Sequence, residues 1–352
     1  MIGMSGGVDS SVAVYLLQSA GFCCTGATLK LYSRNNPYYQ NGLPYPENDD
    51  MQQAAQVAEK LNIPFVLLDR IPEFQSAVVD RFVSVYEYGG TPNPCLYCNQ
   101  SIKFPMLLEE ADKRGISYIS TGHYARIEQN TKSGRYMLKK AVDTAKDQSY
   151  VLYGLSQEIL KRLKLPLGIY TKQEIRAIAA EQGFSNSQKN DSQDICFVPD
   201  GDYYRFMLGY TGKTYPSGSF VDSKGNVLGT HKGIVAYTIG QRRGLGLSLK
   251  QPMYVAEKDT EKNTVILCEN AQLFTKTLYA DSVNWLSIEK PKKPISVQAK
   301  IRYNQKEQPA VVYVQSDDIV KVVFDAPQRA IAKGQAVVFY DGDLVLGGGT
   351  IL

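Results

Sequence analysis

The first half of the chain alternates between helical and strand-like patterns of apolar residues. Helices are predicted at 11–20, 51–61, 73–88, 103–114 and 173–182, and a glycine directly follows four of them. Short apolar runs at 23–31, 65–69 and 116–120 are typical of buried strands. Strands that alternate with helices of this length predict βαβ units and a doubly wound parallel sheet. The segments 124–128 and 135–139 predict a hairpin around Gly134.

The pattern changes after Gly201. Turn residues now recur between short runs rich in Val, Ile and Tyr, which predict strands at 254–256, 264–268, 296–302, 310–315, 319–324, 335–340 and 344–346. Asp341 and Gly342 form a hairpin signal between the last two strands. Small β-barrels or sandwiches have this pattern. We expect an α/β domain over 1–200, a central mostly-β domain over 201–272 and a C-terminal β-barrel over 273–352.

Composition limits the class of protein. The chain has 352 residues, of which 43% are hydrophobic and 21% charged, which excludes a disordered chain or a coiled coil. The net charge of +4 neither indicates nor excludes a nucleic-acid partner. No run approaches the ~18 apolar residues of a membrane span, and the N-terminus has no signal-peptide pattern. We therefore expect a cytoplasmic protein without a membrane partner.

A glycine-rich segment over residues 3–11 lies between a very short predicted strand and a helix. Its glycines allow a tight turn with inward N–H groups, and the helix start adds positive potential, so the segment predicts a phosphate cradle. It lacks the Gly-Lys-Ser/Thr of a Walker A loop, and Asp9 suits a Mg²⁺ ion. A plain helix-capping turn is the alternative. The string SGGVDSS resembles the PP-loop of ATP pyrophosphatases, which hold ATP by its β- and γ-phosphates and release pyrophosphate.

The six cysteines divide into two groups. Cys23, Cys24 and Cys268 lie in apolar runs and are predicted to pack in the core. Polar residues and prolines flank the other three, Cys95, Cys98 and Cys196, which are predicted to carry chemistry. Cys98 precedes a predicted helix, and a helix N-terminus favours the thiolate, so we expect its thiol pKa to be lowered.

Several motifs occur in one order along the chain. SGGVDSS is followed by Asn-Pro-x-x-x-Cys-Asn at 93–99, Gly-His-Tyr-Ala at 122–125, Lys-Asp-Gln-Ser at 146–149 and Asp-Ser-x-x-Ile-Cys-Phe at 191–197. With Gly-Gln-Arg-Arg-Gly-Leu-Gly at 240–246, this order resembles the bacterial tRNA-specific 2-thiouridylases over essentially the whole chain. Members of that family place sulfur on the wobble uridine of certain tRNAs.

The resemblance implies an ATP-dependent tRNA-uridine 2-sulfurtransferase. The uridine 2-oxygen would be adenylated with ATP and Mg²⁺, and sulfur would come from a persulfide on Cys196. Cys98 would close a disulfide with Cys196 and free the sulfur. The implied partners are tRNA and a sulfur donor, either a sulfur-relay protein or a cysteine desulfurase.

The resemblance also assigns residues. ATP would be contacted by Gly3, Met4, Ser5, Gly6, Gly7, Val8, Asp9, Ser10, Leu29 and Gly122, with Asp9 also catalytic and at the Mg²⁺ ion. Asn93, Pro94 and Cys95 would border the flipped-out base. Further contacts to tRNA would come from His123, Lys146, Asp147, Gln148, Arg302, Tyr303 and Gln335.

Cys95 departs from the family pattern, because some members have an Asp there that is a candidate general base. A thiol at this position opens a second possibility, in which Cys95, Cys98 and Cys196 hold an iron–sulfur cluster. The persulfide route is favoured. Two other functions stay open: a PP-loop ligase or amidotransferase for a small molecule, and a tRNA-binding protein without catalysis. The SGGVDSS loop and the two cysteines argue against the second.

Overall fold

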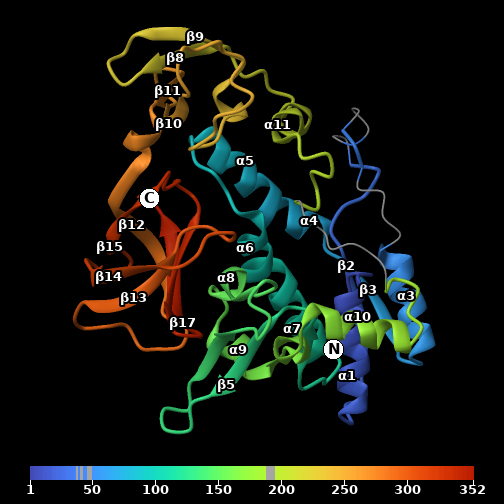
Figure 1. Cartoon of the computed structure of the whole chain (residues 1–352). Helices are drawn as coiled ribbons and strands as arrows, with labels where there is room; N and C mark the ends of the chain where they lie inside the picture. The colour runs from blue at the N-terminus through green and yellow to red at the C-terminus, as the bar shows by residue number, and fades with distance from the viewer. Residues whose placement is uncertain (37–38, 40–42, 46–49, 188–194) are drawn as a thin grey trace.

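The computed structural model describes residues 1–36, 39, 43–45, 50–187 and 195–352. It has an α/β domain on the right of Figure 1, a small β domain at the top and a β-barrel on the left. The predicted fold class is confirmed. None of the helices in these ranges is both long and apolar enough to cross a membrane.

The α/β domain contains a five-stranded parallel sheet in the order β3-β2-β1-β4-β7. Its strands are β1 (Ile2–Gly3), β2 (Gly26–Lys30), β3 (Phe65–Asp69), β4 (Ile119–Thr121) and β7 (Leu163–Lys164). The chain runs from β1 through β2 to β3 on one side and then places β4 on the other side of β1. In such sheets the carboxyl ends of the strands at this reversal bind ligands.

The predicted helices are present, although two of them belong to longer helical runs. Helices α1 (Val8–Ser19), α3 (Asp50–Lys60) and α10 (Lys172–Glu181) are separate. The helix predicted at 73–88 consists of α4 (Ile71–Phe74), a π-helix (Gln75–Val79) and α5 (Asp80–Glu87), which point toward the central domain in Figure 1. The one predicted at 103–114 is the end of a run that begins with α6 (Pro94–Cys98), continues as a π-helix (Asn99–Lys103) and closes with α7 (Phe104–Lys113). Two short helices that were not predicted, α8 (Ser149–Leu152) and α9 (Gln157–Arg162), follow the hairpin.

The central domain begins with α11 (Tyr203–Thr211) and forms a four-stranded sheet in the order β10-β11-β8-β9. Strands β10 (Tyr254–Asp259) and β11 (Thr264–Cys268) lie where they were predicted. Strands β8 (Gly218–Asp222) and β9 (Val227–His231) were missed. Both contain glycine and are mostly half-exposed, so their apolar alternation is weak.

Six antiparallel strands close the C-terminal barrel in the order β12-β15-β14-β13-β16-β17, because β12 also pairs with β17. They are β12 (Phe274–Asn284), β13 (Ile295–Lys300), β14 (Gln308–Val314), β15 (Val320–Arg329), β16 (Ala336–Asp341) and β17 (Leu344–Ile351). Only β12 was not predicted. A register shift and the positive φ of Ser282 interrupt its alternation.

The predicted hairpin of β5 (Ala125–Gln129) and β6 (Tyr136–Lys140) joins two domains. It belongs to the α/β domain in sequence, yet β6 pairs with β17 of the barrel. An ion pair of 2.5 Å between Arg126 and Asp343 strengthens this contact. The barrel is therefore held against the α/β domain, and its loops can reach the site at the sheet edge.

Candidate active site

The glycine-rich loop connects β1 to α1 at the reversal point of the sheet. Gly6 has a φ of +73°, and a Cβ there would lie 2.3 Å from the Asp50 carbonyl oxygen, so glycine is required. The Ser10 hydroxyl accepts from the Ser5 N–H at 3.2 Å and donates to the Gly7 carbonyl at 3.0 Å. The buried Asn186 amide donates to the Gly6 carbonyl at 3.0 Å and to the Ser11 hydroxyl at 2.9 Å. The protein's own side chains thus hold the loop in shape.

Gly122 follows β4 and lies against the first turn of α1. A Cβ at this position would be 2.7 Å from the Ser10 nitrogen and 2.8 Å from the Asp9 carbonyl carbon. A larger residue would push β4 away from the loop. The two segments that the sequence assigned to ATP therefore meet at one edge of the sheet.

Asp9 is neutralised inside the protein. Both of its carboxylate oxygens lie 2.8 Å from the Lys172 ammonium, and the Tyr124 hydroxyl donates to one of them at 2.6 Å. Lys172 is 8% exposed. The sequence analysis missed this pair because Lys172 stands 163 residues from Asp9 and no local pattern marks it. Since a cation already holds both oxygens, the arrangement does not fit direct Mg²⁺ binding by Asp9.

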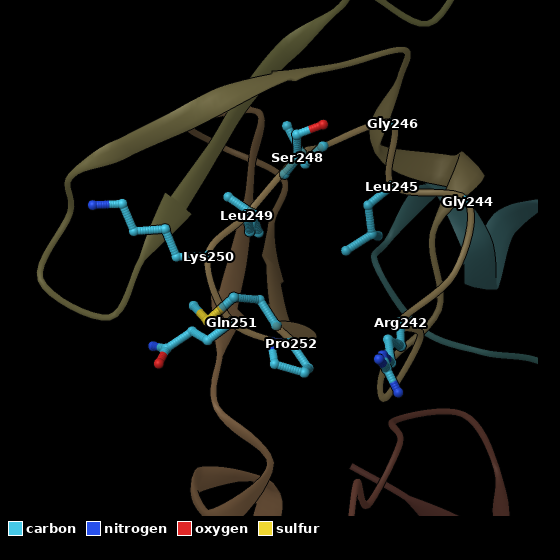
Figure 2. A pocket seen from close by; sticks show the side chains of 11 residues that line it. Arg242, Gly244, Leu245, Gly246, Ser248, Leu249, Lys250, Gln251 and Pro252 are labelled. Carbon is cyan, nitrogen blue, oxygen red and sulfur yellow. The ribbon is translucent and has the colours of Figure 1, made fainter.

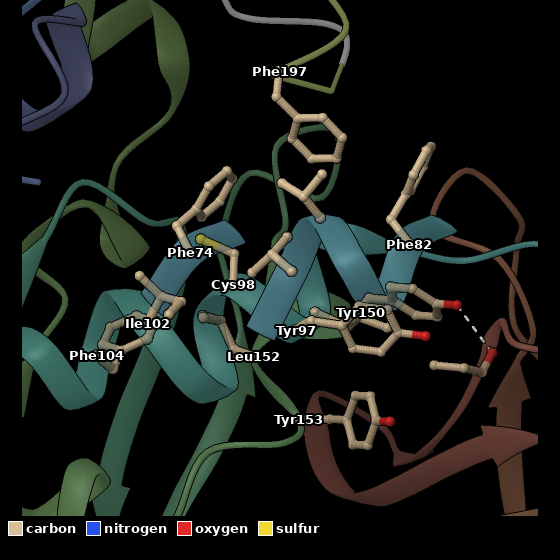
Figure 3. Close-up of a cluster of buried hydrophobic side chains, with 14 of the residues drawn as sticks. Phe74, Phe82, Tyr97, Cys98, Ile102, Phe104, Tyr150, Leu152, Tyr153 and Phe197 are labelled. Carbon is tan, nitrogen blue, oxygen red and sulfur yellow. Dashed lines mark hydrogen bonds between the residues drawn. The ribbon is translucent and has the colours of Figure 1, made fainter. Parts of the chain in front are cut away.

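Cys98 lies inside the largest apolar cluster, close to Phe74 in Figure 3. Burial raises the pKa of its thiol to about 11, the nearby Cys95 adds to this rise, and Lys103 opposes it. The expected lowering of the pKa is therefore wrong. The helical run begins at Pro94, so Cys98 stands within the run and not at its N-terminus.

Cys95 and Cys196 are exposed to solvent, although the surrounding protein still desolvates their thiols. Exposure together with dense surroundings is what a residue lining a concave surface shows. The pKa of Cys196 is raised by desolvation first and then by Cys98 and Cys95, so the three thiols are electrostatic neighbours. All three are free thiols in this structure.

The other cysteines follow the core prediction with one exception. Cys24 and Cys268 are buried, whereas Cys23 is exposed. The prediction for Cys23 is wrong because β2 begins only at Gly26, which leaves Cys23 in the connection after α1.

The iron–sulfur possibility finds no support in the geometry. Within the described ranges, no three His, Cys, Asp or Glu side chains are close enough together to hold a metal ion. The three cysteines, as arranged here, do not fit a cluster, and we derive no step through one.

Lys103 is a charged neighbour of the thiols that the sequence analysis missed. It ends the π-helix after Cys98, is half-buried, and its charge lowers the thiol pKa of Cys95, Cys98 and Cys196. It also acts on His123, whose pKa lies well below its usual value, first through burial and then through Lys103. The sequence alone could have indicated this neighbour, because Lys103 stands only five positions after Cys98.

Comparisons with known proteins show the family of this chain. Family models match residues 1–200 (tRNA methyl transferase HUP domain), 205–269 (tRNA methyl transferase PRC-barrel domain) and 275–351 (aminomethyltransferase β-barrel domain). Curated tRNA-specific 2-thiouridylases cover the whole chain: that of Clostridioides difficile is 48% identical with 97% of its own length covered, and that of Acetivibrio thermocellus is 47% identical with 98% covered. The 2-thiouridylase of Halothermothrix orenii is 46% identical, with 98% of its length covered. The chain belongs to the tRNA-specific 2-thiouridylase family.

Four residues that the 2-thiouridylase resemblance assigned to tRNA have partners inside the protein. His123 is 8% exposed and shares a 2.7 Å hydrogen bond with Thr121. The Asp147 carboxylate accepts from the Ala141 N–H and the Ser149 hydroxyl, and the side-chain amide oxygen of Gln148 accepts from the Tyr124 N–H. The Gln335 amide donates to the carbonyls of Thr91 (2.9 Å) and Pro92 (3.2 Å). The side chains of these four residues are therefore held by contacts within the protein.

The remaining assigned residues lie in different parts of the fold. Asn93 caps α6 and Pro94 begins it. Tyr303 is 37% exposed, and Cys95 is among the groups that raise its pKa, after burial and Asp147. Lys146 and Arg302 are half-buried, and Leu29 packs against the core from β2.

Proposed function

We propose that this chain uses ATP to replace the 2-oxygen of the tRNA wobble uridine with sulfur. One observation carries the proposal: the residues that follow β4 connect the glycine-rich loop to the helical run that contains two of the three neighbouring thiols. Gly122 touches the start of α1, and the next residue, His123, packs its ring 5.5 Å from Phe104, which follows Lys103. Lys103 is the charged neighbour of the thiols. An adenylated uridine held at this edge would be within reach of sulfur.

In the first step the uridine 2-oxygen attacks the α-phosphate of ATP. The O–P bond forms, pyrophosphate leaves, and the oxygen becomes part of a good leaving group. The residues proposed to hold ATP are those from Gly3 to Ser10 with Leu29 and Gly122. In support, the loop is already shaped by Ser10 and Asn186, and its N–H groups lie at the start of a 12-residue helix.

In the second step the outer sulfur of a Cys196 persulfide attacks uridine C2, and AMP leaves with the old oxygen. Cys98 attacks the inner sulfur, which breaks the S–S bond and leaves a Cys98–Cys196 disulfide. A thiol reductant restores both cysteines before the next turnover. The exposure of Cys196 supports its loading by a sulfur-relay protein or a cysteine desulfurase, and the burial of Cys98 suits a thiol that reacts only with Cys196.

The proposed substrate enters as a flipped-out base beside Asn93, Pro94 and Cys95. The barrel supports this segment, because Gln335 holds the two residues that precede Asn93. We further propose that the chain divides at about residues 200 and 272, so that the central domain and the barrel frame the tRNA.

Reconstitution tests the proposal. Purified protein, ATP, Mg²⁺, an unmodified tRNA transcript and a cysteine desulfurase with cysteine should yield 2-thiouridine by mass spectrometry, with equal amounts of AMP and pyrophosphate. Pyrophosphate release that does not depend on tRNA would instead favour a small-molecule ligase. Binding of tRNA without any formation of AMP would favour a non-catalytic protein. Iron and sulfide analysis after anaerobic purification separates the sulfur routes: iron-free protein that thiolates tRNA excludes the cluster.

A further inference from the structure

Two arginines lie together where the barrel meets the central domain. Gly240 has a φ of +86°, and a Cβ placed on it would be 3.5 Å from the Arg329 guanidinium and 3.8 Å from that of Arg302. Both guanidinium groups therefore lie beside Gly240, and the Ala330 Cβ, 2.9 Å from the same position, leaves no room there for a side chain. Gly240 begins the motif at 240–246, to which the proposed reaction gives no role.

Neutral groups hold both arginines. Arg302 donates to the Ala330 carbonyl, and Arg329 donates to the Asn270 side chain at 2.9 Å while its guanidinium lies 5.0 Å from the centre of the Tyr254 ring. The acid next to Asn270, Glu269, accepts from Gln251. In the part of the chain that the structure describes, no carboxylate forms an ion pair with either arginine.

The positive charges of Arg302 and Arg329 repel each other. Burial and then Arg329 lower the pKa of Arg302. Two neighbouring, half-buried cations without an acid repel one another, and an anion between them would relieve this cost. Guanidinium groups match the geometry of phosphate oxygens with paired N–H donors.

The surroundings suit a nucleic-acid backbone. The loop from Arg242 to Met253 lines an open pocket of about 390 Å³, and Figure 2 shows Arg242 at the end where the ribbon of the barrel lies. Arg242 is exposed. Tyr303, the residue that follows Arg302 in the sequence, is electrostatically coupled to Cys95. A strand of RNA that enters the thiol site would therefore pass the arginine pair.

We propose that Arg302 and Arg329 together bind one backbone phosphate of the tRNA, close to the modified nucleotide. The site joins the barrel to the central domain and gives the 240–246 motif a role, since only glycine at position 240 lets this loop lie against Ala330 beside the two arginines. The inference rests on the proposed function in that it takes tRNA as the substrate. Arg329, which the family resemblance did not assign, becomes a binding residue.

Salt-dependent binding of a tRNA transcript tests the site in Arg302→Gln, Arg329→Gln and the double variant. Each phosphate contact contributes about 0.7–0.9 to the slope of log Kd against log salt. We expect either single variant to lower the slope by about one contact and to weaken binding about 5- to 10-fold at 0.1 M salt. The double variant should lose little more, because both arginines share one phosphate. Lys161→Gln, an exposed lysine on α9, is the matched charge control and should keep the wild-type slope.

Chemical substitution in the RNA gives an independent readout. A neutral methylphosphonate at one linkage near the wobble position should weaken binding to the wild type and have no further effect on Arg329→Gln. Arg329→Lys, which keeps the charge but loses the paired donors, should fall between the two. Unchanged slopes with no sensitive linkage would overturn the phosphate site, as would variants that weaken only binding of the sulfur-donor protein. If wild-type protein neither binds nor thiolates tRNA, the proposed function itself fails, so the two failures are distinguishable.

Discussion

The phosphate loop and the thiol site both belong to the α/β domain but are built in opposite ways. At the loop, several side chains are held by partners within the protein: Ser10 donates to Gly7, the Asn186 amide nitrogen to Gly6, and Lys172 to Asp9. At the thiols, Cys98 is buried among apolar side chains, Cys95 and Cys196 are exposed, and a lysine is their charged neighbour. Internal hydrogen bonds hold the loop in one shape, whereas the three cysteines remain free thiols and two of them are exposed to solvent.

The difference fits two kinds of reactant. A preorganised loop would bind the phosphate groups of ATP with little reorganisation of the protein. Sulfur transfer needs a residue that is loaded by one protein, discharged to RNA and resolved by a second thiol, so it cannot be locked in internal contacts. Four experiments test this difference between the loop and the thiols, and they are given in order of decreasing expected effect.

Replacing the proposed sulfur carrier should have the largest effect. Cys196→Ser should lower thiolation by about 10³-fold or more, as loss of a nucleophile does, with tRNA binding near the wild-type value. Cys23→Ser, which removes an exposed thiol elsewhere, is the control. Mass spectrometry of the tRNA product measures the outcome, and an active Cys196→Ser enzyme would show that another residue carries sulfur.

At the phosphate loop, substitution of Asp9 should destabilise the protein more than substitution of its ion-pair partner Lys172. The Lys172 side chain is 10% exposed and that of Asp9 29%, so Asp9→Asn removes the carboxylate from the more buried group of the pair and should destabilise the protein by about 3–5 kcal/mol. Lys172→Met leaves a more exposed carboxylate and should cost about 1–3 kcal/mol. Denaturation curves and tRNA-dependent pyrophosphate release measure both variants. Equal losses would show that the pair does not act as a buried unit.

Removing the charge beside the thiols should shift the pH dependence of thiolation. Because the pKa of Cys98 is raised to about 11, its thiolate fraction and the rate of the resolving step should increase as the pH rises from 7 toward 11. Lys103 opposes that rise in pKa, so Lys103→Met should move the profile to higher pH and lower the rate at pH 8 by about tenfold per unit of displacement. Single-turnover rates over the pH range provide the measurement. A profile that does not move would exclude Lys103 from the electrostatics of the thiols.

The smallest effects should come from the residues that position each region. Asn186→Ala removes two hydrogen bonds from the phosphate loop, and Gln335→Ala removes two from the segment before Asn93, each at about 1–3 kcal/mol. We expect Asn186→Ala mainly to raise the KM for ATP and Gln335→Ala mainly to lower the thiolation rate. Steady-state kinetics with each substrate varied would reveal the split, and identical kinetic changes in both variants would contradict two separately held regions.

Regular patterns made the fold predictable. Strand β3 was predicted at its observed bounds, and the barrel strands other than β12 were also predicted. Burial on one face of a strand requires apolar and polar residues to alternate along the sequence, and this alternation can be recognised. Strands β8, β9 and β12 were missed, since glycines, half-exposed positions or a shifted register weaken the same alternation. The sharing of β6 with the barrel sheet could not be predicted, because pairing between distant strands depends on how whole domains pack.

For the site, the sequence by itself determined the glycine loop, the three cysteines proposed to carry the chemistry and the family, because close spacing and the order of motifs can be seen in the sequence alone. The tertiary structure decided the rest. It paired Asp9 with Lys172, set the thiol pKa of Cys98 by burial, engaged His123 and Asp147 inside the protein, and brought Arg329 to Arg302. Charge pairing and desolvation depend on distance in space, and residues far apart along the chain acquire that distance only when the chain folds.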